Sequence, residues 1–209
     1  MTPRADISEE RRTQIIQAAR ACFARQGYHR TTMDDIVRES GLSKGTLYWY
    51  FSSKEELFLA ILDAWWRDLA QAIQKPASDA ASTVERLTAW VDALTRFIQA
   101  GLDRVRLIME FWAEVHRSHE IERKLGQIYR ERARLLADII QQGVDRGEFR
   151  TVDPYTTAQT FLAAYDGLLL QQVLLPDRFS WDEVNRLVID TLLHGLLAYR
   201  PGGRDAVVF

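Results

Sequence analysis

Apolar residues recur at intervals of three and four positions along almost the whole chain, and the strict alternation typical of half-buried strands is absent. Such spacing places apolar side chains on one face of an α-helix. The first apolar stripe precedes Gly27, a residue type that often ends helices, and consists of Ile15, Ile16, Ala19, Cys22 and Phe23. We therefore predict an all-α protein.

Capping residues divide the following part of the chain into short helices. Thr32 is suited to cap a second helix, Gly41 breaks it, and Ser43 caps a very short third helix. Ser53 and Glu56 form an S-x-x-E capping box, which opens a fourth helix that we expect to reach about residue 74. Three short helices and the start of a longer one are thus predicted within the first quarter of the chain.

Longer amphipathic helices are predicted beyond a polar, proline-containing linker at 75–82, KPASDAAS. Asp153 followed by Pro154 is a typical helix start, and Ser180 with Glu183 forms another capping box. The expected helices are one that ends near Gly101, one that contains 105–115, and others over 118–146, 154–175 and 180–199, before a loose tail at 201–209.

The second and third helices are joined by a tight turn at Gly41 and Leu42, which is the arrangement of a helix-turn-helix. The second helix of such a motif lies in the major groove of DNA. Lys44 offers a point charge or hydrogen bonds to guanine, and Thr46 offers a hydroxyl and a methyl group. Gly45 has no side chain, so DNA could approach the backbone closely.

Aromatic residues crowd the end of the predicted third helix. Leu47 and Phe51 fall at helical intervals and are expected to turn inward, whereas Tyr48 lies on the opposite face, flanked by Trp49 and Tyr50. Indole N–H and phenol O–H groups can donate hydrogen bonds to phosphate oxygens. Aromatic residues in helices are more often part of a core, so packing of Trp49 and Tyr50 inside the small domain is the alternative.

The distribution of charge also favours an anionic partner for this segment. The formal net charge of the chain is −2, but the window from Arg20 to Lys54 contains six cations and three anions, a net charge of +3. A local basic patch on an acidic protein indicates a site for an anion such as the DNA backbone.

The stretch TTMDDIVRESGLSKGTLYWYFSSKEELFLAIL resembles the DNA-binding segment of tetracycline-repressor-like (TetR-type) transcriptional regulators, from about Arg12 to Ile61. The resemblance implies that Lys44, Gly45, Thr46 and Tyr48 face the bases. It also implies phosphate contacts from Thr32, Trp49, Tyr50 and Lys54. Thr31 would replace Thr32 in that role if the hydroxyl of Thr32 is used as the helix cap.

The resemblance is looser beyond residue 82 and implies a regulatory domain that dimerises and usually encloses a ligand cavity. We therefore expect an N-terminal three-helix helix-turn-helix domain at 1–56 and a helical-bundle ligand-binding and dimerisation domain at 57–209. A small, largely hydrophobic effector, or a cation held by aromatic rings and Glu110, is the expected ligand. Since pockets and cores share composition, the alternative is that these residues are mostly core, and any single one is more often structural than ligand-binding. The candidate ligand-binding residues are Trp66, Phe97, Glu110, Phe111, Trp112, His116, Tyr129, Phe161 and Tyr165.

Small residues along the last two predicted helices favour a homodimer. Gly167 lies within a helix, where glycine costs about 1 kcal/mol relative to alanine, and Ala163 precedes it by one turn. Small side chains let helices approach closely, either between two subunits or inside one. The predicted dimer interface consists of Ala163, Gly167, Leu170, Val184, Val188 and Gly195.

Other classes of function find less support. His116 and His119 form H-x-x-H, but they lie across a predicted helix junction, so we predict no metal site. We find no nucleophile elbow or phosphate-binding glycine loop and predict no enzyme activity and no cofactor. The single cysteine, Cys22, and the lack of a signal peptide or membrane-length apolar run favour a cytoplasmic protein without membrane contact.

The sequence thus predicts a homodimeric DNA-binding transcriptional regulator. Its expected partners are double-stranded operator DNA, a second copy of the chain and a small-molecule effector that releases it, as a repressor, from a pseudo-palindromic operator. The alternative is an all-helical ligand-binding protein or enzyme without DNA function, which would lack a salt-dependent affinity for duplex DNA.

Overall fold

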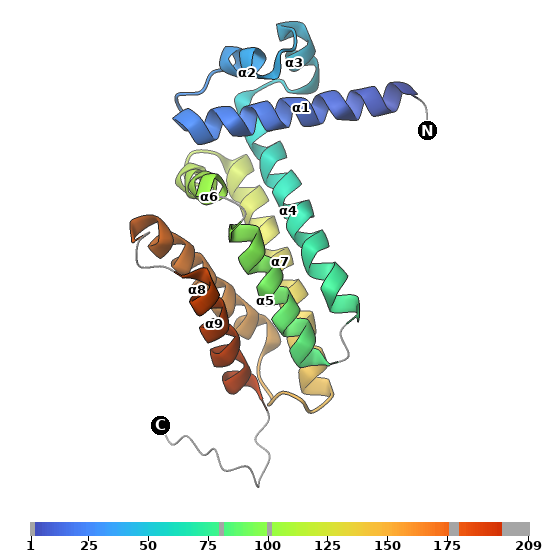
Figure 1. Cartoon of the computed structure of the whole chain (residues 1–209), viewed down its shortest axis with the longest axis vertical. Coiled ribbons are helices and arrows are strands. Elements are labelled where there is room, and N and C mark those ends of the chain that lie inside the picture. The colour runs from blue at the N-terminus through green and yellow to red at the C-terminus, as the bar shows by residue number, and fades with distance from the viewer. Residues whose placement is uncertain (1–2, 80–81, 100–101, 176–179, 198–209) are drawn as a thin grey trace. The chain divides into compact units, whose positions relative to one another are not determined.

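The computed structural model describes residues 3–79, 82–99, 102–175 and 180–197, and most of them are helical (Figure 1). Within these ranges no strand occurs, and an isolated antiparallel bridge joins Phe149 and Leu197. The all-α prediction is confirmed. The helices are α1 (Pro3–Gln26), α2 (Met33–Ser40), α3 (Lys44–Tyr50), α4 (Lys54–Asp79), α5 (Thr83–Gln99), α6 (Leu102–Glu114), α7 (His119–Asp145), α8 (Pro154–Leu174) and α9 (Trp181–Leu196).

Several helices begin at the capping residues expected from the sequence. Thr32 precedes α2, where its hydroxyl accepts the Asp35 N–H at 3.2 Å and its own N–H donates to the Asp35 carboxylate at 2.8 Å. Ser43 precedes α3 and Asp153 precedes α8, and each side chain accepts the N–H of the residue three positions later. These side chains satisfy backbone donors that have no partner within the helix.

The capping box at the start of α4 differs from the prediction. The Ser53 hydroxyl accepts the Glu56 N–H at 3.0 Å as expected. The Glu56 carboxylate, however, accepts the N–H and the hydroxyl of Ser52, at 2.7 and 2.9 Å, rather than the N–H of Ser53. The reciprocal half of the box is therefore displaced by one residue, since a glutamate side chain is long enough to reach either amide.

Two helix ends also differ from the prediction. α4 continues to Asp79, so most of the predicted linker at 75–82 is helical, although proline inside a helix removes a backbone donor and crowds the preceding turn. α9 ends at Leu196 rather than near residue 199, because the Leu196 carbonyl accepts the Arg150 N–H at 2.7 Å from outside the helix. The predicted tail and Pro176 lie outside the described residues.

One compact unit comprises Met1–Gln71 and Ile98–Ile128. In it α1 lies against α2 and α6, and α2 and α3 lie together along one side of α1 (Figure 1). Ile15, Ile36 and Leu47 are fully buried and form the core between α1, α2 and α3. The Phe58 ring on α4 lies 4.3 Å from the Tyr28 ring and 3.9 Å from the Phe111 ring, measured between centroids. Stacked rings thus link the α1–α2 loop through α4 to α6.

The second compact unit comprises Ala72–Phe97 and Tyr129–Phe209. Trp90 and Tyr165 are among its largest fully buried side chains. The Tyr165 hydroxyl lies 2.6 Å from the Thr95 hydroxyl, which donates to Asn185 Oδ1 at 2.8 Å, and the Asn185 amide donates to Asp92 at 2.7 Å. This network joins α5, α8 and α9 and satisfies polar groups inside the core.

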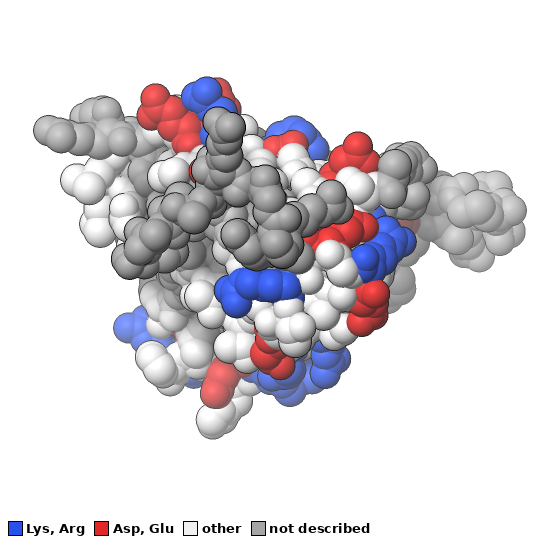
Figure 2. Space-filling model, turned by 90° about the horizontal axis from the view of Figure 1, so that it is seen from below, with Lys and Arg blue, Asp and Glu red and all other residues white. Residues whose placement is uncertain are grey.

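These units do not follow the predicted domain boundary between residues 56 and 57, because α4 and α7 each contribute to both units. The boundary stays a prediction. Figure 2 shows acidic and basic side chains interspersed over one face, as on an ordinary solvated surface. Within the described ranges, no helix is long and apolar enough to cross a membrane.

Candidate nucleic-acid interface

The turn between α2 and α3 has the geometry expected of a helix-turn-helix. Gly41 ends α2 in the left-handed region, with φ 67°, and its N–H donates to the Val37 carbonyl. A left-handed backbone favours glycine because it has no Cβ. The Gln14 amide on α1 donates to the Ser40 carbonyl at 2.7 Å. This contact fixes the turn against α1 and so sets the position of α3.

The side chains of α3 divide between two faces. Leu47 and the adjoining Phe51 are buried, whereas Tyr48 is 43% exposed and Trp49 is 74% exposed. The sequence left the direction of the Trp49 side chain undecided, and in the structure it points outward. Tyr50 is half-buried and donates from its hydroxyl to Ser8 on α1 at 3.2 Å, so it supports the position of α1 as well as facing the surface.

The first turn of α3 places a compact polar group at the surface. The Thr46 and Ser43 hydroxyls lie 2.8 Å apart. A Cβ added to Gly45 would lie 3.9 Å from Ser43 Oγ, an ordinary contact distance, so the fold itself leaves room for a side chain there. The absence of a side chain at Gly45 is consistent with close approach of a partner to the α3 backbone.

Lys44, the first residue of α3, forms an ion pair with Asp34 on α2, with 2.8 Å between Nζ and Oδ1. The hydrogen bond and the charge of Asp34 raise the pKa of Lys44, so the ammonium group stays charged at neutral pH. Two further cations of the basic window are paired, Arg25 with Glu39 and Arg38 with Asp35. These three pairs use all three anions of the window, so its net charge of +3 resides on Arg20, Arg30 and Lys54.

Three side chains that we predicted to contact phosphate form hydrogen bonds within the protein. Thr31 is 1% exposed and donates from its hydroxyl to the Gly27 carbonyl at 2.8 Å. The Thr32 hydroxyl donates to the Asp35 carboxylate at 2.7 Å. Lys54 Nζ donates to the Tyr28 and Thr31 carbonyls at 2.7 and 3.0 Å. Their roles toward phosphate stay predictions, and each would require sharing or exchange of these bonds.

Two α6 carboxylates contact the loop that precedes α2. Glu110 accepts the Tyr28 N–H at 2.5 Å, and Glu114 lies 2.7 Å from His29 Nε2 and 3.0 Å from Arg117 Nη1. These contacts could not be predicted from the sequence, because they join segments far apart along the chain. Glu110 was a candidate anchor for a cationic ligand; that role stays a prediction and would compete with the Tyr28 amide.

The other candidate ligand-binding residues are distributed over both compact units. Phe111 and Tyr165 are fully buried in their respective cores, and His116 is exposed. Phe161 is half-buried, with its ring 6.0 Å from that of Tyr165. Their role toward a ligand stays a prediction. The remaining four are half-buried and are Trp66, Phe97, Trp112 and Tyr129.

The candidate dimer residues lie on α8 and α9, and two of them, Val184 and Val188, line a groove between these helices. This groove of about 510 Å³ is lined mainly by apolar and threonine side chains, among them Phe161, Leu168, Val184 and Val188. Among the described residues outside the helix's own backbone, no atom lies within 4 Å of a Cβ built at Gly167 or Gly195. The dimer interface stays a prediction. Ala163 and Leu170 are also exposed.

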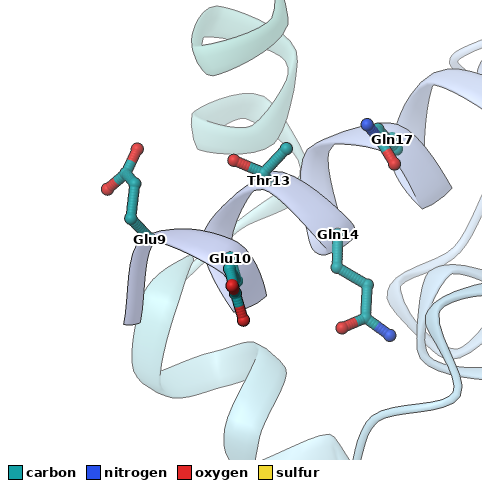
Figure 3. A pocket seen from close by; sticks show the side chains of 5 residues that line it. All are labelled: Glu9, Glu10, Thr13, Gln14 and Gln17. Carbon is teal, nitrogen blue, oxygen red and sulfur yellow. The ribbon is translucent and has the colours of Figure 1, made fainter. Parts of the chain in front are cut away.

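A second groove, of about 480 Å³, follows the exposed side of α1 (Figure 3). Its lining includes Glu9 and Glu10, and Figure 3 shows their carboxylates pointing away from the helix on different sides. Carboxylates repel phosphate, so we do not include this groove in the candidate interface. Among the described residues, no cluster of three histidine, cysteine, aspartate or glutamate side chains could hold a metal ion.

The fold and the exposed surface of α3 together define a helix-turn-helix DNA-binding regulator with an additional helical domain. Residues 15–61 match the sequence profile of bacterial regulatory proteins of the tetR family, and residues 60–198 match that of the C-terminal domain of BetI-type transcriptional repressors. The chain belongs to the tetR family of bacterial regulatory proteins.

Relatives support the same assignment. The HTH-type transcriptional regulator YfiR of Bacillus subtilis is 31% identical over 173 residues, which cover 81% of this chain and 84% of that protein. The regulator TtgR of Pseudomonas putida is 31% identical over 180 residues, covering 81% and 83%. A transcriptional regulator from Saccharomonospora viridis in complex with choline has a TM-score of 0.78 at 26% identity, covering 91% of this chain and 100% of that chain. The names of these relatives favour a regulator over the alternative of an enzyme or ligand-binding protein.

Proposed function

We propose that this regulator is a homodimeric repressor whose two α3 helices bind the half-sites of a pseudo-palindromic operator. The observation that carries the proposal is that one chain exposes two surfaces suited to partners. α3 presents Tyr48, Trp49 and the bare backbone of Gly45 to a partner. α8 and α9 present an apolar surface, and a two-fold dimer would cover it in both copies.

The proposed dimer interface rests on exposed apolar and small residues of α8 and α9. Leu187 is 66% exposed beside the groove, and water contact of such a side chain is unfavourable. Gly167 and Gly195 have open space before them, which a second helix could enter closely. In a two-fold arrangement the same surface meets itself, so each residue of this surface contributes twice.

The proposed effector is a small, largely hydrophobic molecule bound by the C-terminal domain. The match of residues 60–198 to BetI-type repressors and the choline complex of the Saccharomonospora viridis regulator support a small ligand. The effector would favour a dimer whose recognition helices are wrongly spaced for the operator. The size of that shift is limited by the difference in its affinity for the two states.

A test of the dimer uses the open space at the two glycines. Gly167→Gln with Gly195→Gln adds bulky polar side chains whose Cβ atoms have open space among the described residues, so the chain should keep its helical circular dichroism. Sedimentation should show a monomer, and operator affinity should fall at least about tenfold, because two half-sites are no longer bound together. Ala113→Gln, on an exposed position of α6, is the control and should remain a dimer. A doubly substituted chain that is still dimeric refutes this interface.

A test of DNA binding and of repression uses the gene's own upstream DNA. A footprint should cover two half-sites about one or more helical turns apart. Lys44→Ala with Tyr48→Ala should abolish the mobility shift, and unchanged binding would refute the assignment of α3. Deletion of the gene should raise transcription from the bound promoter; a fall would identify an activator instead.

A further inference from the structure

The ion pair between Lys44 and Asp34 lies at the start of the recognition helix. Lys44 is the first residue of α3, Asp34 is the second residue of α2, and both side chains are 61% exposed. Because Nζ and Oδ1 are only 2.8 Å apart, the carboxylate shares the surface on which Lys44 would meet DNA. Asp34 lies in the first turn of α2, where negative charge is favoured.

Asp34 is the carboxylate paired with Lys44. Arg25 and Arg38 have their own carboxylates, Glu39 and Asp35. A phosphate oxygen that approaches Lys44 must displace or share Asp34, and it meets the repulsion of that carboxylate at close range. Exposed ion pairs contribute little to stability, so the structural role of this pair in the fold is small.

A base pair presents different chemistry from a phosphate. In the major groove, guanine offers the acceptors O6 and N7, and its cytosine partner offers the N4 amino group as a donor. Lysine pairs with the two adjacent acceptors of guanine, and aspartate accepts from cytosine N4, so Lys44 beside Asp34 matches a G·C pair and mismatches a phosphate, where only acceptors are found. Repulsion by Asp34 is therefore relieved at a G·C pair and persists at the backbone.

We propose that Asp34 is a specificity-determining residue: it weakens phosphate contacts by Lys44 and directs the ammonium group to a G·C base pair in each half-site. The inference rests on the proposed role of α3 as the recognition helix. Phosphate contacts supply most non-specific affinity, whereas base contacts distinguish sequences. Asp34 thereby lowers non-specific binding without an equal loss at the operator.

The test compares Asp34→Asn with Glu39→Gln, which removes the same charge from the carboxylate paired with Arg25. Affinity is measured for a random-sequence duplex and for a duplex selected by the wild-type protein, over a range of salt. Asp34→Asn should raise non-specific affinity about five- to tenfold at low salt and steepen the salt dependence by about one counterion. Operator affinity should change less than about twofold. Glu39→Gln should change both affinities less than about twofold.

Two further measurements separate the pair from a general charge effect. In a Lys44→Gln background, Asp34→Asn should leave the salt dependence unchanged. Selection from a random duplex library should show a G·C preference at one position per half-site in the wild type that is lost in Asp34→Asn. Equal effects of Asp34→Asn and Glu39→Gln, or an effect that persists without Lys44, overturn the inference. A wild-type protein that selects no sequence instead overturns the proposed function.

Discussion

Three glycines show how differently a single residue type is constrained in this chain. Gly41 has φ 67° and turns the chain between α2 and α3. Gly143 faces Phe149, whose ring would lie 2.2 Å from an added Cβ. Gly45 has neither a left-handed backbone nor a close neighbour. The sequence predicted the turn at Gly41, but the need for glycine at Gly143 depends on Phe149 folding back onto α7.

Gly45→Ala separates a requirement of DNA from a requirement of the fold. Since the fold leaves room for a methyl group, the free energy of unfolding should stay constant or rise by up to about 1 kcal/mol, the helix preference of alanine over glycine. Operator affinity should fall about tenfold or more, because the methyl group would meet the DNA at the start of α3. Thermal unfolding and fluorescence anisotropy measure the two quantities. A variant that binds as tightly as the wild type would show that DNA does not approach this backbone.

At the scale of helices, starts were predicted better than ends. Caps at Thr32, Ser43 and Asp153 involve bonds within three residues, so local sequence determines them. The end of α9 depends on the Arg150 amide, which comes from another part of the chain. The loop between α1 and α2 likewise depends on Lys54 from α4 and on carboxylates from α6.

Lys54→Met tests whether Lys54 holds this loop or a phosphate. Its ammonium donates to three loop carbonyls, of Tyr28, His29 and Thr31, and lies 4.3 Å from the centre of the Tyr28 ring. Burial lowers the pKa of Lys54, as expected for a cation partly removed from water. We expect a loss of about 1.5–3 kcal/mol in the free energy of unfolding, typical of hydrogen bonds to charged groups.

The control is Lys44→Met, whose side chain is paired at the surface. It should change stability by less than about 0.5 kcal/mol and lower operator affinity about tenfold, because Lys44 is proposed to contact a base. Lys54→Met should leave the salt dependence of DNA binding unchanged. A smaller salt dependence with unchanged stability in Lys54→Met would instead assign Lys54 to a phosphate.

At the scale of the whole molecule, each compact unit contains a tyrosine whose ionisation opposes folding. Burial raises the pKa of Tyr28 to about 12 in one unit and that of Tyr165 to about 12 in the other. An exposed tyrosine has a pKa of about 10. The folded state thus holds these protons more tightly than the unfolded state does. The resulting stability is fully present below about pH 10 and is lost as the pH rises toward 12.

A spectrophotometric titration of the phenols should therefore show Tyr28 and Tyr165 ionising only near pH 12. Tyr165→Phe should remove one late transition and reduce the loss of unfolding free energy between pH 10 and 12. It should also lower the free energy of unfolding at neutral pH by about 1 kcal/mol, since the hydrogen bond to Thr95 is lost. An unchanged number of late transitions in Tyr165→Phe would contradict this assignment.

The sequence by itself determined the helical class, most helix starts and the chemistry of α3, because periodicity and caps act over a few residues. The tertiary structure decided that Trp49 points outward, that Lys44 is paired with Asp34, and that Lys54 holds a loop. The contacts of Lys44 and Lys54 join residues from different helices or loops. Their geometry follows from how the helices pack, and local sequence preference does not specify that packing.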